Sequence, residues 1–214
     1  MNESTHILPH FIWRAVDFKR RLQSQVFDYC HFGRYLGRYE DSAPEAERGV
    51  NPSQPTAVWI LRYIFGRIYR IQPNEVLVDV GCGQGRVIMW WLKAGYRNKI
   101  YGIEIDEAIA EKARGSLAKY SNVKIIAGDA LEKLPPEGTM FYLFNPFQLK
   151  IALQFRKLIA ERYLPGTVMV YYFPRWIEVF RGDARFEVTE YSPIVSKLTG
   201  GVKAPWTAVV RRVN

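Results

Sequence analysis

The chain has 214 residues, of which 48% are hydrophobic, 24% charged and 14% aromatic. This composition supports a folded core and excludes the disordered chains that combine low hydrophobicity with high charge. Its longest apolar runs fall far short of the roughly 20 residues that span a bilayer, and its N-terminus has no basic start followed by an apolar stretch. Two cysteines, Cys30 and Cys82, are too few for a disulfide framework. We therefore expect a cytoplasmic protein of a reducing compartment, without integral membrane association.

The formal net charge of +9 is unevenly distributed along the chain. Lysine and arginine exceed aspartate and glutamate by 3 in residues 1–70, by 0 in residues 71–139 and by 6 in residues 140–214. Such an excess suits a nucleic-acid surface if the cations gather on one face, and it also suits an ordinary basic surface. On charge alone we favour the ordinary surface.

The first 70 residues have the pattern of helices. Apolar residues recur every three or four positions between Phe11 and Tyr29, and a second such run covers residues 57–69. The intervening residues 40–55 contain three prolines, which would break a continuous helix. We predict an N-terminal helical appendage and linker over residues 1–54, followed by a second domain over residues 55–214. The first helix could lie on a membrane surface or a nucleic acid, but we favour packing on the second domain.

From residue 72 onward, short apolar runs alternate with helical periodicity, which is typical of parallel strands joined by helices. Residues 167–173 are almost wholly apolar, as expected of a central strand covered on both faces. Two late runs are more polar and β-branched, and we place them at a sheet edge. The predicted strands are residues 76–80, 99–105, 123–127, 140–144, 167–173, 186–191 and 206–213, and the predicted helices are residues 84–94, 107–120 and a helix around residues 150–161.

A glycine-rich turn, GCGQG at residues 81–85, stands between the first predicted strand and its helix. Glycines at such a turn let the backbone bend tightly and approach a ligand closely. Arg86 stands where a dinucleotide loop has its third glycine, and Asp79 precedes the turn, which together disfavour NAD. The sequence also contains no GxxxxGK[ST] phosphate loop. The turn therefore indicates a loop that binds a different cofactor.

Three carboxylates follow or end the first three predicted strands. S-adenosylmethionine carries a sulfonium and an ammonium but no phosphate, so a carboxylate at the turn attracts it, and Asp79 is placed to do so. Glu104 lies 19 residues past the last glycine of the turn, where an acidic side chain accepts the hydroxyls of a ribose. Asp129 could accept the adenine amino group. A helix cap for Asp79 and a solvated strand end for Glu104 are the structural alternatives, and we interpret Asp106 as a helix cap.

Four segments resemble, in order, those of the class I S-adenosylmethionine-dependent methyltransferases: VLVDVGCGQG, YGIEID, IIAGDA and FYLFNPF. The resemblance covers about residues 72–173. It implies an α/β fold with a Rossmann-like, seven-stranded, mostly parallel sheet and an antiparallel final strand. It also implies S-adenosyl-L-methionine as the cofactor, with Asp79 and Gly81 at its amino-acid end, Glu104 at the ribose, and Asp129 with Ala130 at the adenine. The other expected cofactor contacts are Cys82, Gly83, Gly85, Ile105 and Asn145.

Asn145, Pro146 and Phe147 follow the fourth predicted strand, at the sheet edge where open α/β folds bind ligands. The Asn145 amide oxygen and a backbone carbonyl suit hydrogen bonds from an acceptor amino group, and the Phe147 ring would offer a face to the substrate. The segment is similar to the (N/D)PP(Y/F) motif of amino-group methyltransferases, although it lacks one proline. In the structural alternative, Asn-Pro opens a turn and Phe147 packs in the core.

We expect a methyltransferase that acts on an amine nitrogen of a protein or other macromolecule, with residues 145–147 as the reaction centre. A protein amine is favoured as acceptor over a nucleic acid or a small molecule. The alternatives are a small-molecule methyltransferase, a cofactor-binding protein without transfer activity and, last, a nicotinamide oxidoreductase. No metal is expected, because Pro9 separates His6 from His10 and the sequence offers them no evident cysteine or carboxylate partner.

Overall fold

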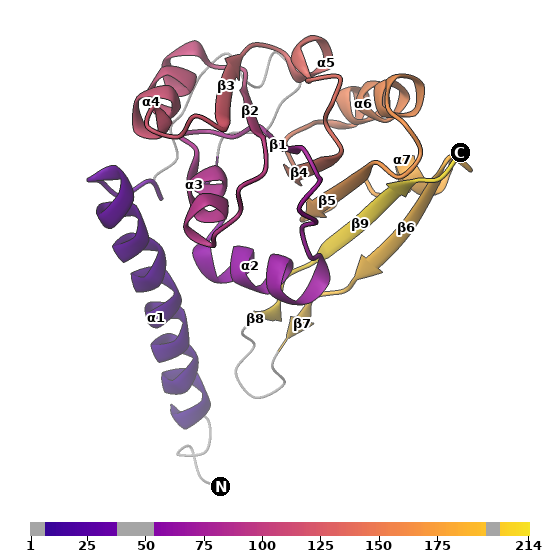
Figure 1. Ribbon diagram of the computed structural model, residues 1–214. Helices are drawn as coiled ribbons and strands as arrows, with labels where there is room; N and C mark the ends of the chain where they lie inside the picture. Colours follow the sequence, from indigo (N-terminus) through magenta and orange to yellow (C-terminus); the bar gives the residue numbers. More distant parts are fainter. Residues whose placement is uncertain (1–6, 38–53, 196–201) are drawn as a thin grey trace, which may run out of the picture.

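A seven-stranded sheet forms the centre of the molecule, and helices cover both of its faces (Figure 1). The computed structural model describes residues 7–37, 54–195 and 202–214. The strands are β1 (Leu77–Val80), β2 (Ile100–Glu104), β3 (Val123–Ala127), β4 (Met140–Phe144), β5 (Val168–Tyr172), β6 (Phe186–Tyr191), β7 (Ile194–Val195), β8 (Val202–Ala204) and β9 (Thr207–Arg212). The helices are α1 (Ile7–Phe32), α2 (Val58–Tyr63), the π-helical turn η2 (Ile64–Ile68), α3 (Arg86–Lys93), α4 (Glu107–Leu117), α5 (Ala130–Lys133), α6 (Leu149–Arg162) and α7 (Glu178–Arg181).

The strand order of the sheet is β3-β2-β1-β4-β5-β9-β6. The first five strands pair in parallel, and β9 is antiparallel to both of its neighbours, β5 and β6. Strands β7 and β8 form a separate two-stranded sheet. This topology confirms the predicted Rossmann-like α/β fold with an antiparallel final strand. The carboxyl ends of β1, β2, β3 and β4 therefore meet along one edge, where the predicted ligand residues lie.

Alternation along the strands divides the core into two layers. Met140 and Tyr142 of β4 belong to the cluster shared with α2 and α3, whereas Phe141 and Leu143 belong to the cluster shared with α6. Consecutive side chains of a strand point to opposite faces, so an apolar strand of this kind must be covered on both sides. Helix α3 is buried at every position from residue 86 to residue 92, because other helices enclose it against the sheet.

The placement of the last strand corrects one prediction. The sequence pattern placed both late strands at a sheet edge, but only β6 lies there, and β9 is inserted between β5 and β6. Ala208 and Val210 of β9 are fully buried. The strand looked half polar because two arginines end it, and at that end of the sheet the Arg212 guanidinium donates to the Ala160 carbonyl oxygen at 3.0 Å.

The other predicted strands and long helices are confirmed within a few residues at each end. Helices α5 and α7 and the β7–β8 pair were not predicted, because two to four residues are too few to show a period. The predicted linker over residues 40–55 lies outside the described residues apart from Gln54 and Pro55, and so does His6.

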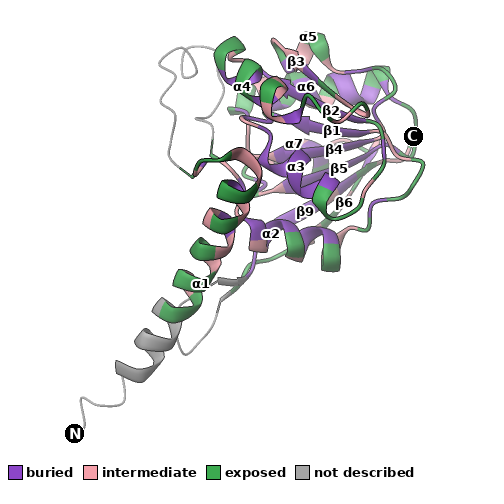
Figure 2. Ribbon diagram, turned by 60° about the vertical axis from the view of Figure 1, so that its left-hand side comes forward, coloured by how far each residue is buried: buried purple, intermediate pink, exposed green. Residues whose placement is uncertain are grey.

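Helix α1 projects from the body and touches it with its C-terminal half (Figures 1 and 2). The Arg20 guanidinium lies 3.9 Å from the centre of the Trp59 ring of α2, and the Ser24 hydroxyl accepts a hydrogen bond from the Val58 amide at 3.1 Å. The outer face of the helix is exposed, including Phe18 and Tyr29. Within the described ranges, no helix has the length and apolar character to cross a membrane.

Candidate active site

The glycine-rich turn connects β1 to α3 by a path that only glycines follow easily. Gly81, Gly83 and Gly85 have φ angles of 77°, 53° and 90°, in the left-handed region. A Cβ on Gly85 would also lie 2.8 Å from Leu117 Cδ1 of α4. The amides of Gly81 and Cys82 both donate to the Ile103 carbonyl oxygen at 2.9 Å, which fixes the turn against the end of β2. The backbone is therefore held at the carboxyl edge of the sheet.

Asp79 lies at the base of this turn and is almost completely buried. Its side chain is 2% exposed, and its Oδ2 atom has no hydrogen-bond partner among the described residues. Burial, and after it the negative charge of Glu104, raise the pKa of the Asp79 carboxyl well above its ordinary value. A buried acceptor atom without a donor costs free energy, so this oxygen is suited to a ligand that donates to it. Asp79 is not a helix cap, because it is a residue of strand β1.

Glu104 ends β2 beside the same turn, and its carboxylate is also buried at 3% exposure. One oxygen accepts from the Gly83 amide at 2.7 Å, and the other accepts from the Asp106 amide at 3.1 Å. Asp106 itself accepts from the Ile109 amide at 3.0 Å and caps α4, as predicted. Glu104 thus holds the turn in place and is not a solvated strand end.

A cavity opens between the turn, the start of α3, the end of β4 and the segment that precedes α2. Four of the predicted cofactor residues line it, and so do residues that were not among the predicted contacts. The lining includes Asp79, Gly81, Cys82 and Gly83 from the prediction, and Leu36, Pro55, Thr56, Arg86, Tyr142 and Phe144 in addition. Burial, and then the charge of Asp79, raise the pKa of the Cys82 thiol, so this thiol stays protonated and is not a nucleophile.

Glu104, Ile105, Asp129 and Ala130 lie outside this cavity, along the ends of β2 and β3, whereas Gly85 belongs to the turn and Asn145 follows β4. The Gly128 amide donates to the Glu104 carbonyl oxygen at 2.8 Å, which brings the two strand ends together. Asp129 is exposed, and one of its oxygens accepts from the Leu131 amide at 2.8 Å as the cap of α5. Ala130 is buried at the start of α5, and Ile105 follows Glu104 directly. The predicted contacts therefore divide into a group that lines the cavity at the turn and a group along the ends of β2 and β3.

The segment of residues 145–147 lies next to the turn. A Cβ on Gly81 would stand 3.5 Å from Pro146 Cβ. Asn145 has a φ of 40°, in the left-handed region, and its side-chain oxygen accepts from the Tyr171 hydroxyl at 3.3 Å. Asparagine adopts this conformation more readily than most residues. The backbone and the Asn145 side chain are thus brought to the edge where the cavity opens.

The position of the Phe147 ring differs from the prediction that this ring would offer a face to the substrate. Phe147 is 6% exposed, and its ring lies 5.0 Å from the ring of Phe155 in the core between the sheet and α6. Its carbonyl oxygen accepts from the Trp176 indole at 3.0 Å. The structural alternative therefore describes this side chain, because the ring is taken up by packing and does not offer a face to a ligand.

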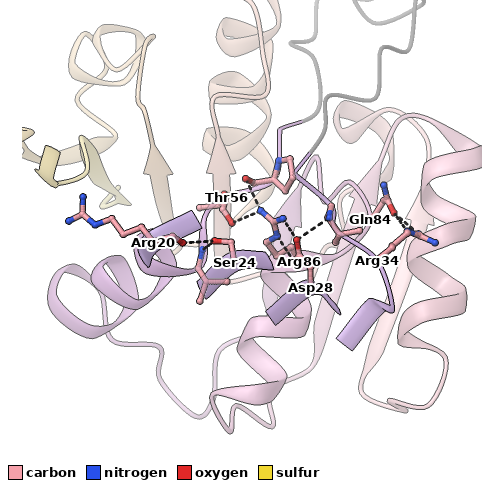
Figure 3. Close-up of polar contacts among 10 residues, drawn as sticks. Arg20, Ser24, Asp28, Arg34, Thr56, Gln84 and Arg86 are labelled. Carbon is pink, nitrogen blue, oxygen red and sulfur yellow. Dashed lines mark hydrogen bonds and ion pairs between the residues drawn. The ribbon is translucent and has the colours of Figure 1, made fainter. Parts of the chain in front are cut away.

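A buried ion pair joins α1 to the turn and was missed by the sequence analysis (Figure 3). Asp28 is fully buried and Arg86 is 4% exposed, and the Arg86 guanidinium donates to both Asp28 oxygens, with Nε to Oδ1 at 2.9 Å. Asp28 also accepts from the Leu36 amide at 3.0 Å. The one local signal was a cation at the start of a helix whose next six residues are all apolar. Its partner lies 58 residues earlier in the chain, where no motif points to it.

Arg86 also holds the segment that forms one wall of the cavity. Arg86 Nη1 donates to the carbonyl oxygens of Pro55 and Thr56 at 3.2 and 3.4 Å. The Thr56 hydroxyl lies 2.9 Å from the Tyr142 hydroxyl on β4. Arg34, after α1, donates to the side-chain oxygen of Gln84 in the turn at 3.1 Å. The cavity is therefore closed by the N-terminal part of the chain as well as by the sheet (Figure 3).

Comparison with known proteins gives a partial match over the sheet. Residues 77–161 match a protein-family model described as a methyltransferase domain. Ribosomal RNA small subunit methyltransferase A of Thermotoga petrophila is 32% identical over 101 residues, which are 47% of this chain and 38% of that relative. The probable cobalt-precorrin-6B C(15)-methyltransferase (decarboxylating) of Archaeoglobus fulgidus is 35% identical over 75 residues, 35% of this chain and 43% of that relative. The aligned segments thus span less than half of each relative.

Solved structures share the fold at low sequence identity. An RNA methyltransferase from Salinibacter ruber, in complex with S-adenosyl-L-homocysteine, superposes with a TM-score of 0.54 at 20% identity and covers 75% of this chain and 94% of its own. The precorrin-6y C5,15-methyltransferase of Geobacter metallireducens gives a TM-score of 0.56 at 14% identity, over 75% of this chain and 90% of its own. These likenesses establish the architecture of the sheet and its helices.

Proposed function

We propose that the chain is an S-adenosylmethionine-dependent methyltransferase whose acceptor is an amine nitrogen on a protein or other macromolecule. The observation that carries the proposal is the buried Oδ2 atom of Asp79, which has no partner among the described residues and lies at a glycine turn. The methyltransferase-domain match over residues 77–161 supports the same assignment.

The chemistry of the turn suits a cationic nucleoside. A carboxylate whose pKa is raised by burial gains most from a ligand that brings a positive charge and a hydrogen-bond donor to it. The ammonium of S-adenosylmethionine is such a group, whereas the pyrophosphate of NAD would be repelled by Asp79 and by Glu104 beside it. The residues present therefore fit S-adenosylmethionine better than a dinucleotide.

The remaining groups suit the rest of the cofactor. Glu104, which holds the Gly83 and Asp106 amides, presents a carboxylate that would accept from the ribose hydroxyls. Asp129 uses one oxygen to cap α5 and has acceptor capacity left for the adenine amino group. Cys82 and Ile105 supply apolar contact in this scheme.

S-adenosylmethionine supplies, when bound, a methyl group on a positively charged sulfur. The task of the chain is to hold an uncharged amine with its lone pair directed at that methyl group and to exclude water. The Asn145 side-chain oxygen, oriented by the Tyr171 hydroxyl, accepts from the amine, and a backbone carbonyl of the same segment accepts the second N–H bond. Phe147 contributes by anchoring this segment in the core, since its ring packs on Phe155.

Binding experiments test this proposal before any acceptor is known. Isothermal titration calorimetry should detect S-adenosylhomocysteine binding to the full chain and should give no heat with NAD under the same conditions. Binding of NAD together with no binding of S-adenosylhomocysteine would reverse the assignment. Binding of S-adenosylhomocysteine without methyl transfer from labelled S-adenosylmethionine to total RNA or total protein would support the non-catalytic alternative instead.

A further inference from the structure

Two adjoining hollows lie at the opposite edge of the sheet from the glycine turn. The segment before β1 and the turn between α3 and β2 form their walls, so both hollows lie at the amino ends of the parallel strands. The first is lined by Arg70, Arg97 and Asn98 among others, and the second by Arg67 and Arg70. Both are also lined by Tyr96. We call Arg67, Arg70 and Arg97 the arginine patch.

The three arginines of this patch are exposed and make no ion pair with any other described residue. Glu75, an acidic residue of the segment that leads to β1, accepts from the Tyr69 hydroxyl and, at 2.8 Å, from the Gln72 amide. A fourth cation, Arg211, is close enough to Tyr69 to oppose the rise of its pKa that burial causes. The patch is therefore a concentration of positive charge without an ion pair to a carboxylate among the described residues.

Several other cations of the second domain are paired with carboxylates. Arg86 is paired with Asp28, and Arg114 and Arg181 each contact two glutamates. Like charges held together repel one another, and an anionic ligand removes this repulsion. Arg67 is moreover carried by the π-helical turn η2, a rare local structure that is frequent at functional sites.

We propose that the arginine patch binds the phosphate backbone of a nucleic acid, at a surface separate from the methyl-transfer edge. Guanidinium groups bind phosphate oxygens with two parallel hydrogen bonds, and they lie here along connected hollows that suit a strand rather than a flat bilayer. The half-buried Tyr96 ring lies in both hollows and suits stacking of a base. The proposal does not depend on the proposed function, because it concerns other residues and another ligand.

The test compares two triple variants with equal net charge. Arg67→Ala/Arg70→Ala/Arg97→Ala removes the patch, and Lys124→Ala/Lys150→Ala/Lys157→Ala removes three exposed cations elsewhere. Binding of a fluorescein-labelled RNA hairpin of mixed sequence is measured by anisotropy over a series of salt concentrations. We expect the arginine variant to lose at least about tenfold in affinity and about two units in the slope of log K against log [salt], at roughly 0.7–0.9 per phosphate contact. The lysine variant should lose less than about threefold.

Several results would overturn the proposal. Equal losses of affinity in the two variants would show a general effect of net charge. If the unaltered chain did not bind RNA, a nucleic acid would be excluded as the partner. Binding to vesicles of phosphatidylglycerol and phosphatidylcholine that depends on the patch, without RNA binding, would assign the surface to lipid. Calorimetry with S-adenosylhomocysteine should give the same affinity for both variants. A loss of that affinity would mean that the substitutions disturb the fold and not the patch alone. The variant with Arg→Lys at the three positions then decides, because it should keep most of the salt slope.

Discussion

Asp79 shows at the scale of one residue how the proposed binding site costs stability. Because the pKa of its carboxyl is raised in the folded chain, the folded state keeps a proton that the unfolded chain has already lost above its ordinary value near 4. The free energy of unfolding of the ligand-free chain therefore falls as the pH rises from that value through the folded pKa. A cationic ligand restores what the buried charge costs.

We therefore predict opposite effects of Asp79→Asn on stability and on binding. The ligand-free variant should melt higher than the unaltered chain at neutral pH, by about 2–8 °C for roughly 1–2 kcal/mol in a domain of this size, and its melting temperature should vary less with pH. Its affinity for S-adenosylhomocysteine should fall at least about tenfold, since a hydrogen bond to a charged group is lost. Asp106→Asn is the control, because Asp106 caps α4 and asparagine caps a helix as well as aspartate. An Asp79→Asn variant with unaltered affinity would remove the basis of the proposed function.

Asn145 combines strain with a chemical role, and two substitutions separate them. With φ at 40°, Asn145→Gly should leave the free energy of unfolding nearly unchanged, whereas Asn145→Ala should lower it by about 1 kcal/mol. Both lack the amide, so both should lose most methyl transfer from labelled S-adenosylmethionine while binding S-adenosylhomocysteine within about tenfold of the unaltered chain. Full transfer by Asn145→Gly would show that the side chain does not position the acceptor.

At the scale of elements, local patterns predicted the fold well and non-local pairings poorly. The glycine turn, Asp79 and Glu104 lie within strand–turn–helix units whose geometry follows from neighbouring residues, so their placement at one edge could be predicted. The Asp28–Arg86 pair joins residues 58 apart, and the insertion of β9 depends on pairing with β5, so neither has a local signal. The direction of the Phe147 ring depends on its packing against α6, which the motif does not encode.

The contact between α1 and α3 yields a prediction at the same scale. Asp28→Ala leaves the buried Arg86 guanidinium without its partner and should lower the free energy of unfolding by about 3–5 kcal/mol in chemical denaturation. The double variant Asp28→Leu/Arg86→Leu should recover much of that loss, because no buried charge remains. Its affinity for S-adenosylhomocysteine should nevertheless stay reduced, since Pro55 and Thr56 lose the donor that holds them.

An exposed pair on the same helix provides the control for this experiment. Arg21 and Asp17 are 2.8 Å apart, with 74% and 31% of their side chains exposed, and Asp17→Ala should change the free energy of unfolding by less than about 1 kcal/mol. If the double leucine variant bound S-adenosylhomocysteine as tightly as the unaltered chain, the ion pair would be structural only, without a role in shaping the cavity.

At the scale of the whole molecule, the cavity belongs to two distant parts of the chain at once. Its lining comes from the glycine turn and β4, and also from Leu36 and residues 55–56, which the Asp28–Arg86 pair ties to α3. A ligand in this cavity contacts both parts and stabilises their association. Ligand binding and the docking of α1 are therefore coupled, and each should strengthen the other.

Hydrogen exchange with mass spectrometry checks this coupling. S-adenosylhomocysteine at about 100 times its dissociation constant stabilises a one-site protein by roughly 2.7 kcal/mol, which should raise the melting temperature by about 5–10 °C. The same addition should slow exchange in the C-terminal half of α1 and at Leu36, whose amide is bonded to Asp28, and should leave the amides around the arginine patch unaffected. Slowing at the glycine turn alone, with α1 unchanged, would mean that the sheet binds the nucleoside without the helix. Because the Asp28–Arg86 pair is the link, the slowing in α1 should also disappear in the double leucine variant even when enough ligand is added to saturate it.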